Sequence, residues 1–147
     1  MERLVASLHR GGWLALQVPA NLHDAHHQAI ATLATSPEWA PVVGSRFRRV
    51  DEIGDPVDYA DRLDQLGCVV DAWETTYLHV LQGPDPVLEW VKGTALRPTL
   101  DALAHDPSLQ ARFCDQLAPM LRAAFPRRQY GIPFPFRRVF AVARRRA

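Results

Sequence analysis

Basic side chains are concentrated at the C-terminal end of this sequence. The segment from Arg122 to Ala147 contains eight arginines and no acidic residue, whereas the segment from Asp51 to Asp71 contains seven acids and one arginine. Concentrated positive charge attracts nucleic acids or small anionic ligands. The alternative is a solvated rim that ends in a frayed tail at Arg144–Arg146. Both interpretations stay open on the sequence alone.

One basic residue differs from the others in kind. The chain has sixteen arginines but a single lysine, Lys92. This skew indicates a coding bias, so an isolated arginine carries little functional information. Lys92 therefore stands out, and it lies beside Gly93 at a predicted junction between two helices.

Cysteine, histidine and apolar patterns exclude several protein classes. Cys68, Cys114 and the six histidines have no metal-ligand spacing, so no metal is expected. The cysteines are interpreted as reduced, buried thiols of a cytoplasmic protein. The composition, 48% hydrophobic and 22% charged over 147 residues, is typical of one globular domain. The apolar runs are too short to cross a bilayer, and no export signal is found.

The elements that must position these residues predict an α/β protein. Three strands are expected at Trp13–Val18, Cys68–Val80 and Phe136–Arg144, the first of them buried on both faces. The expected helices are Glu2–His9, Ala25–Leu33, a short one from Ser36 to Val43, Asp55–Leu66, one from Asp85 to about Lys92, one after Gly93-Thr94, and Asp106–Phe125. Asp55, Asp85 and Asp106 each precede a proline, which is the signal of an N-cap followed by proline at the first helical position. Three strands make a small sheet for so many helices, so the chain looks incomplete.

Four strings, in this order along the chain, resemble the trans-aconitate methyltransferase family. They are Gly11–Pro19 followed by Asn21 and His27, then Trp73–His79, then Val87–Pro98, and finally Pro133–Phe140. Together they cover almost the whole chain with family-like spacing. Ala20 stands where relatives usually have glycine.

The resemblance implies a fold. These enzymes are class I S-adenosylmethionine-dependent methyltransferases with a doubly wound, Rossmann-like sheet of strand order 3-2-1-4-5-7-6. Their glycine-rich cofactor loop follows the first strand, whereas Gly11-Gly12 precedes a strand and matches the turn before the fifth. Residues 1–147 are therefore expected to be the C-terminal half of the domain, holding the 5-7-6 strands and substrate-side helices. The cofactor-binding half is expected to be absent, and the last strand should lie antiparallel between the other two.

The resemblance also implies a function. It is methyl transfer from S-adenosyl-L-methionine to a carboxylate of trans-aconitate, giving a monomethyl ester. With the cofactor loops missing, the isolated chain is expected to be inactive, and its cofactor-binding residues are unknown. The alternative is an inactive fragment that acts only as a binding or interaction module. A small tricarboxylate is the expected partner, without nucleic acid or membrane, and an exposed sheet edge would allow self-association.

Family matches and chemistry together nominate five substrate-binding residues. A carboxylate is already deprotonated at pH 7, so no catalytic base is needed and recognition is the protein's task. The candidates are His27, Tyr77, Lys92, Arg97 and Arg137. Cationic and hydroxyl donors are suited to binding the remaining carboxylates of a tricarboxylate.

Each candidate has an ordinary structural alternative. Lys92 could be a solvated helix end, and His27 could cap its turn. Tyr77 and Trp73 share a strand face, where they form either core packing or an aromatic wall. Arg137 and Arg138 point to opposite faces of the last strand, and Arg137 is preferred for the pocket.

Overall fold

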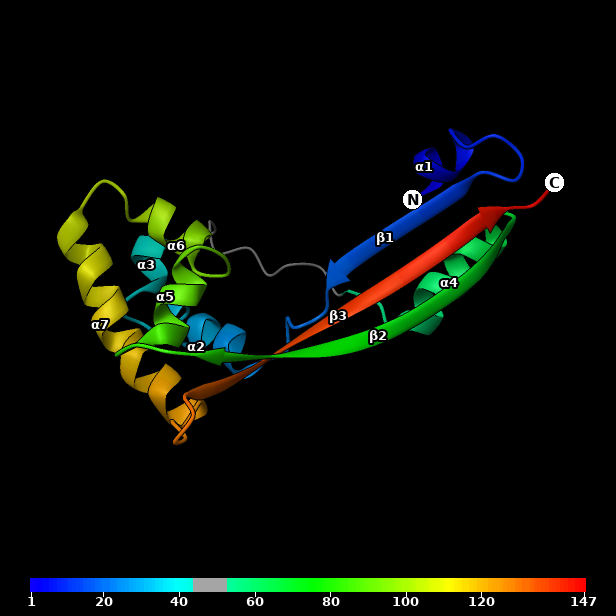
Figure 1. Ribbon diagram of the computed structural model, residues 1–147. Coiled ribbons are helices and arrows are strands. Elements are labelled where there is room, and N and C mark those ends of the chain that lie inside the picture. Colours follow the sequence, from blue (N-terminus) through cyan, green and yellow to red (C-terminus); the bar gives the residue numbers. More distant parts are fainter. Residues whose placement is uncertain (44–52) are drawn as a thin grey trace. The chain divides into compact units, whose positions relative to one another are not determined.

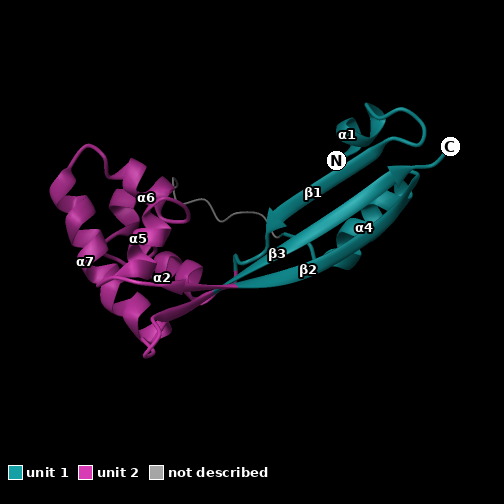
Figure 2. Cartoon of the chain, in the orientation of Figure 1, with its two compact units in different colours: residues 1–22, 51–77, 135–147 teal, residues 23–50, 78–134 magenta. Residues whose placement is uncertain are grey.

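The computed structural model describes residues 1–43 and 53–147, which form two compact units (Figure 2). Unit 1 comprises residues 1–22, 51–77 and 135–147, and unit 2 comprises residues 23–50 and 78–134. Asp51 and Glu52, at the beginning of the acidic stretch, lie outside the described residues. The expectation of a single domain over 1–147 remains a prediction.

Three strands form one sheet in the order β1-β3-β2 (Figure 1). They are β1 (Trp13–Pro19), β2 (Cys68–Leu81) and β3 (Ile132–Arg145). β1 pairs antiparallel with β3, from Trp13 opposite Arg144 to Pro19 opposite Arg138. The Arg146 N–H donates to the Gly67 carbonyl at 2.9 Å, so the start of β2 lies beside the end of β3. The last strand is therefore antiparallel between the other two, as predicted.

β3 is longer than the sequence indicated. It begins at Ile132 rather than Phe136 and so includes Pro133 and Pro135. Prolines cannot donate a ladder hydrogen bond, which is why they were interpreted as a loop. In the structure this segment is nevertheless part of β3. Just before β3, the Tyr130 carbonyl accepts a hydrogen bond at 2.7 Å from the side-chain amide of Gln82, the residue that follows β2.

The inner face of the unit 1 sheet is covered by two helices, α1 (Glu2–Ala6) and α4 (Pro56–Gln65). Their contacts with the sheet form a core around five buried residues, Val5, Leu63, Cys68, Ala141 and Ala143. Side chains of β1 alternate between half-buried and exposed. The expectation that β1 is buried on both faces is therefore wrong, because the helices cover only one face of the sheet.

α1 is shorter than expected and ends at Ala6 instead of reaching His9. The Ser7 hydroxyl donates to the Leu4 carbonyl at 2.8 Å. A serine that bonds to the backbone in this way competes with continued helix, and this ends α1 early.

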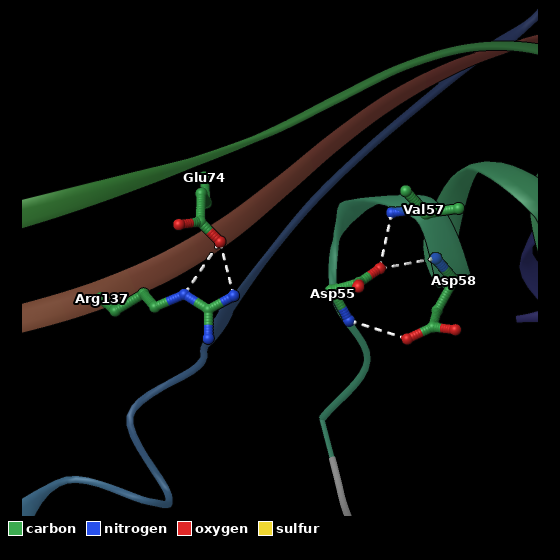
Figure 3. A network of polar contacts seen from close by, with 5 residues as sticks. All are labelled: Asp55, Val57, Asp58, Glu74 and Arg137. Atoms are coloured by element: carbon green, nitrogen blue, oxygen red, sulfur yellow. Dashed lines mark hydrogen bonds and ion pairs between the residues drawn. The ribbon is translucent and has the colours of Figure 1, made fainter.

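α4 begins at a complete capping box, drawn in Figure 3. The Asp55 carboxylate accepts from the Val57 N–H at 2.8 Å and from the Asp58 N–H at 3.1 Å. In return, the Asp58 carboxylate accepts from the Asp55 N–H at 2.8 Å. The helix ends before Gly67, which has φ 81°, a left-handed conformation that glycine adopts without strain. Both predicted ends of this helix are confirmed.

Unit 2 is mainly helical. Its elements are α2 (Ala25–Ala34), α3 (Ala40–Val43), α5 (Pro86–Lys92), α6 (Arg97–Ala102) and α7 (Pro107–Ala124). α7 contacts α2 and α5, while α6 contacts α3 and α5. At the core, the Trp39 ring meets Phe113 edge-on with centroids 4.9 Å apart, and its Nε1–H donates to Gln116 Oε1 at 2.6 Å. The predicted helices are confirmed to within a few residues.

Asp85 was expected to cap α5, and this expectation is wrong. Its carboxylate forms no cap hydrogen bond and instead accepts from Arg122 Nε at 2.6 Å and Nη2 at 2.7 Å. A two-point guanidinium–carboxylate pair is stronger than a bond to a neutral backbone N–H. Asp106, which has the same sequence signal, does cap its helix.

The C-terminal arginines are bonded to the rest of unit 1 and do not form a frayed tail. β3 continues to Arg145, whose guanidinium donates to the Leu8 carbonyl. Arg146 forms an ion pair with Asp64 of α4. Arg144 and Arg145 therefore belong to the sheet and Arg146 is held by α4, which corrects the interpretation of Arg144–Arg146 as frayed.

We expect Asp55→Ala to lower the free energy of unfolding by about 1 kcal/mol, the usual cost of losing an N-cap carboxylate. Asp55→Ser should retain most of the stability, because a serine hydroxyl also accepts from the first-turn N–H groups. Urea unfolding measures the difference, and Asp61→Ala, an exposed acid within the same helix, is the matched control. Equal stability of Asp55→Ala and Asp61→Ala would contradict the capping role.

Candidate functional site

The five predicted substrate-binding residues are distributed over both units. Tyr77 and Arg137 belong to unit 1, whereas His27, Lys92 and Arg97 belong to unit 2. Within unit 2, Lys92 ends α5 and Arg97 begins α6, and these two helices contact each other.

Lys92 and Arg97 are both charged and both paired with acids of their own helices. Lys92 Nζ lies 2.6 Å from Glu89 Oε1, and its side chain is 37% exposed. The hydrogen bond that Lys92 donates to Glu89 raises the pKa of Lys92, so the ammonium stays protonated. Arg97 Nε donates to Asp101 at 2.8 Å, and both of these side chains are well exposed. Pairs of this spacing on an exposed helix surface contribute only about 0.3–0.5 kcal/mol.

Arg137 is paired across strands with Glu74 (Figure 3). Its Nε and Nη2 both donate to Glu74 Oε2, at 2.9 and 2.5 Å. Arg138 lies over the Phe136 ring, with its guanidinium carbon 4.8 Å from the centroid, and donates to Gln17 Oε1 at 2.5 Å. Of the two arginines, Arg137 is therefore the one that is held by an acid.

Tyr77 and Arg137 lie on opposite faces of the sheet by strand alternation. Arg137 has the same parity as the buried Val139 and Ala141, which face the helices. Tyr77 has the parity of Trp73, which stacks on Phe140 with centroids 5.4 Å apart and an interplanar angle of 6°. Tyr77 is 45% exposed, and Arg138 rather than Arg137 shares its face. The geometry therefore does not place Tyr77 and Arg137 against one ligand on a single face.

His27 and His26 are adjacent in the first turns of α2. Their ring centroids are 4.5 Å apart, and His26 also packs on Phe125 and Phe134. Burial lowers the pKa of His27, and burial together with the neighbouring His27 lowers the pKa of His26 to about 4. The lowered pKa values favour the neutral form of both rings at pH 7, so neither ring is well suited to supply positive charge for a carboxylate.

Gly11 and Gly12 do not fit a cofactor loop. The Gly11 N–H donates to the Arg145 carbonyl at 3.0 Å, and the Gly12 N–H donates to the His9 carbonyl at 2.9 Å. A Cβ at Gly12 would lie 2.9 Å from the His9 carbonyl oxygen, so this glycine is required by the close turn. Both amide donors are used within the chain.

Neither a metal centre nor a membrane span is found in the part of the chain that the structure describes. There, no cluster of three or more His, Cys, Asp or Glu side chains could hold a metal ion. The same residues include no helix that is long and apolar enough to cross a membrane. Cys68 is buried and Cys114 half-buried, and both are free thiols.

Comparison with known proteins identifies the relatives of this chain. It is 49% identical over 135 residues to the trans-aconitate 2-methyltransferase of Streptomyces coelicolor, a match of 92% of this chain and 45% of that protein. It is 46% identical to the protein of the same name from Mycolicibacterium gilvum, over 97% of this chain and 56% of that protein. This chain is a relative of the trans-aconitate 2-methyltransferases. No protein-family model matches it.

The match to trans-aconitate 2-methyltransferases extends over nearly all of this chain but only part of theirs. The chain spans about half the length of the curated relatives it matches. The resemblance predicted from the four strings is confirmed. The activity and substrate of the complete enzymes remain proposals for this chain.

Sequence reasoning did not find two features of these surfaces. The first is the burial of His26, which is 2% exposed although only His27 matched the methyltransferase pattern. The second is the contact of Arg138 with Gln17 and Phe136. Strand parity could have placed Gln17 and Arg138 on one face, but only the register of β1 against β3 brings them together.

We expect the stability of the protein to fall in mildly acidic solution because of His26. Its pKa in the folded state is about 4, below the usual 6.5, so the unfolded chain binds a proton more readily between these values. The stabilisation is present above pH 6.5 and is lost as the pH falls toward 4, roughly 2 kcal/mol of it between pH 7 and pH 5. His26→Leu should reduce this pH dependence by that amount in urea titrations at both pH values.

The matched control is His105→Leu, which replaces an exposed histidine. This variant should keep the wild-type pH dependence. An unchanged pH dependence in His26→Leu would show that another group is responsible.

Proposed function

We propose that this chain is the substrate-recognition part of an S-adenosyl-L-methionine-dependent methyltransferase that esterifies a carboxylate of trans-aconitate. The observation that carries the proposal is the high identity, over more than nine-tenths of this chain, to proteins named trans-aconitate 2-methyltransferase. The observed strand order β1-β3-β2 supports the assignment of these strands as the 5-7-6 part of the family sheet. The chain would then be the C-terminal half of a Rossmann-like domain.

The proposed chemistry needs positioning more than it needs proton transfer. The nucleophile is a carboxylate oxygen that is ionised at pH 7, and the methyl donor, when bound, supplies a carbon attached to a positively charged sulfur. The contribution of this chain is to hold the carboxylate in line with that carbon and to bind the other carboxylates of the substrate. No described residue is needed as a general base.

The acid partners of the predicted cations indicate how substrate binding would occur. Lys92 and Arg97 are held only by exposed pairs within their own helices, which a substrate carboxylate can replace at small cost. Arg137 donates two hydrogen bonds to Glu74, so a substrate would have to displace a stronger partner. We therefore rank Lys92 first among the proposed carboxylate ligands. Among the ion pairs of the described residues, the guanidinium of Arg138 has no acid partner and donates to Gln17 instead. Arg138 is therefore the alternative to Arg137 as a ligand.

We expect Lys92→Ala to raise KM for trans-aconitate about tenfold to hundredfold, because one charge-assisted contact is lost. The variant is tested in a chimera of the Streptomyces coelicolor relative whose matched region is replaced by this chain, with KM and kcat measured separately. Arg112→Ala is the control, and we expect it to leave KM unchanged. Arg112 is not a proposed substrate ligand, because it pairs with Glu38 and covers the Trp39 ring. An unchanged KM in Lys92→Ala would return this residue to the role of a solvated helix end.

The same chimera distinguishes the two arginines of β3. If Arg137 binds the substrate, we expect Arg137→Ala to raise KM about tenfold or more and Arg138→Ala to leave it within about twofold. The reverse result would assign the contact to Arg138. Tyr77 lies on the sheet face of Arg138, so Tyr77→Phe, which removes only a hydroxyl, should raise KM only if Arg138→Ala also does.

We also expect this chain by itself neither to bind S-adenosyl-L-methionine tightly nor to transfer methyl groups. The reason is that Gly11 and Gly12 use their amide donors within the chain and give no cofactor loop. Titration calorimetry with S-adenosyl-L-methionine and a methyl-transfer assay on trans-aconitate test this. Micromolar binding or turnover by the 147 residues would overturn the expectation.

A second candidate function is a binding module without catalysis. It is favoured by one observation, the exposed apolar side chains on the outer face of the unit 1 sheet. Under this alternative, the chimera would be inactive while the isolated chain still bound a polypeptide. A location in the cytoplasm is compatible with either function and stays a prediction.

A further inference from the structure

We propose that two copies of this chain associate through the edge of β2 that faces away from β3, which we call the free edge. The two unit 1 sheets would then join into one sheet across a two-fold axis, by antiparallel pairing of residues 69–77 with the same residues of the second copy. The order β1-β3-β2 leaves β2 at one side of the sheet, and in the described part of the chain only β3 lies beside it (Figure 1). The inference does not depend on the proposed substrate or on methyl transfer.

Two hydrogen bonds at the end of β3 show which backbone groups of β2 point to the free edge. The Arg145 N–H donates to the Gly12 carbonyl on the β1 side, and the Arg146 N–H donates to the Gly67 carbonyl on the β2 side. Backbone groups alternate in direction along an antiparallel strand, so Gly67 and the odd-numbered residues after it face β3. The free edge therefore receives the N–H and C=O groups of the even-numbered residues, which in this stretch are Val70, Ala72, Glu74 and Thr76.

The free edge lacks most of the features by which proteins prevent strands from pairing. Residues 69–77 contain no proline, glycine or lysine and consist mainly of valine, threonine and aromatic residues, which favour strands. Trp73 stacks on Phe140, as expected when the register is counted from Gly67 and Arg146, so no bulge interrupts β2 between these positions. A long and regular edge of this composition is expected to pair with another strand.

The opposite edge of the sheet is less suitable for such pairing. β1 has 7 residues, whereas β2 has 14. The even-numbered residues of β1 face β3, as the hydrogen bond to Gly12 shows, so Pro19 faces away from β3 and has no N–H to donate. β2 is therefore the edge that offers an unbroken row of donors and acceptors.

The charges along β2 favour a register in which Trp73 lies opposite Trp73 of the second copy. In this register Asp71 lies opposite Thr75, whose hydroxyl can donate to the carboxylate, and Glu74 lies opposite Ala72. No acid then faces an acid. A register centred on Asp71 or on Glu74 would instead bring two carboxylates together at the two-fold axis, which is destabilising.

The side chains of this register are complementary in the same way. The two Trp73 rings would form an aromatic pair at the axis, and Val69 would lie opposite Tyr77, which buries side chains that are 61% and 45% exposed in the single chain. The remaining acid close to the axis, Glu74, is already paired with Arg137 of its own chain. A second copy of this chain therefore matches the edge in both charge and apolar contact.

The first test is the mass of this chain in solution, measured by size-exclusion chromatography with light scattering over a range of concentrations. We expect the mass of a dimer at micromolar concentrations of the chain. Thr76→Pro should raise the dissociation constant at least about tenfold, because proline removes an N–H that points to the second copy and not to β3. Thr76→Val retains this N–H and is the matched control, which should dimerise like the wild type. Circular dichroism verifies that each variant is folded.

A cysteine substitution tests the register. In a background that carries Cys68→Ala and Cys114→Ser, Trp73→Cys should give a disulfide-linked dimer under mild oxidation, because the two copies of this residue lie directly opposite each other. Thr75→Cys is the matched control, since it lies opposite Asp71 and not opposite its own copy, and it should remain unlinked. A link through Thr75→Cys without one through Trp73→Cys would overturn the proposed pairing.

Further outcomes separate this inference from its rivals. A chain that stays monomeric at every concentration, or a dimer that Thr76→Pro leaves intact, would overturn the proposal. A dimer that is broken by Trp13→Glu and not by Thr76→Pro would assign the contact to the outer face of the sheet and would also overturn it.

The same measurements on the chimera distinguish the dimer from the proposed function. A chimera that dimerises through β2 but transfers no methyl group would support the dimer while contradicting the proposed function. An active chimera that is monomeric would contradict the dimer and leave the proposed function intact. Association and activity are therefore read independently.

Discussion

The central position of β3 is the constraint on which unit 1 depends. This strand is the last in the sequence, yet it hydrogen-bonds to β1 from the first twenty residues and to β2 from the middle of the chain. β1 and β2 run in the same direction, and in the sheet each of them neighbours β3. Its buried residues Val139, Ala141 and Ala143 also face the helices. The C-terminal segment thus provides both the backbone pairing and the central part of the core.

The same strand organises the charges of unit 1. Its arginines reach partners on two other strands and one loop, namely Glu74 on β2, Gln17 on β1 and the Leu8 carbonyl after α1. A basic C-terminal end is therefore used largely inside the chain, where it fixes neighbouring segments. This explains why the concentration of arginine is a weak guide to a ligand, and why the single lysine on a different unit is more informative.

The two faces of the unit 1 sheet differ in what covers them. One face is covered by helices and has small or aliphatic residues, and the other exposes tryptophans. The covered face packs on α1 and α4, which supply its core contacts.

The sequence by itself determined the family and most of the elements. Local signals are strong in this chain: Asp-Pro pairs open α4 and α7, Gly67 ends α4, and β-branched and aromatic residues form β2. These signals act between residues that are close in the chain, so they can be read without the fold. The order β1-β3-β2 was also predicted, but from the family resemblance and not from the residues alone.

Only the tertiary structure decided how the side chains are used. It showed that Asp85 binds Arg122 instead of capping α5, that Arg137 is paired with Glu74, and that β1 is exposed on one face. Each of these depends on a partner 37 or more residues away, or on the layer that covers a face. A side chain with two available partners takes the one that gives the stronger bond or the better burial, and sequence spacing does not reveal which distant partner is within reach.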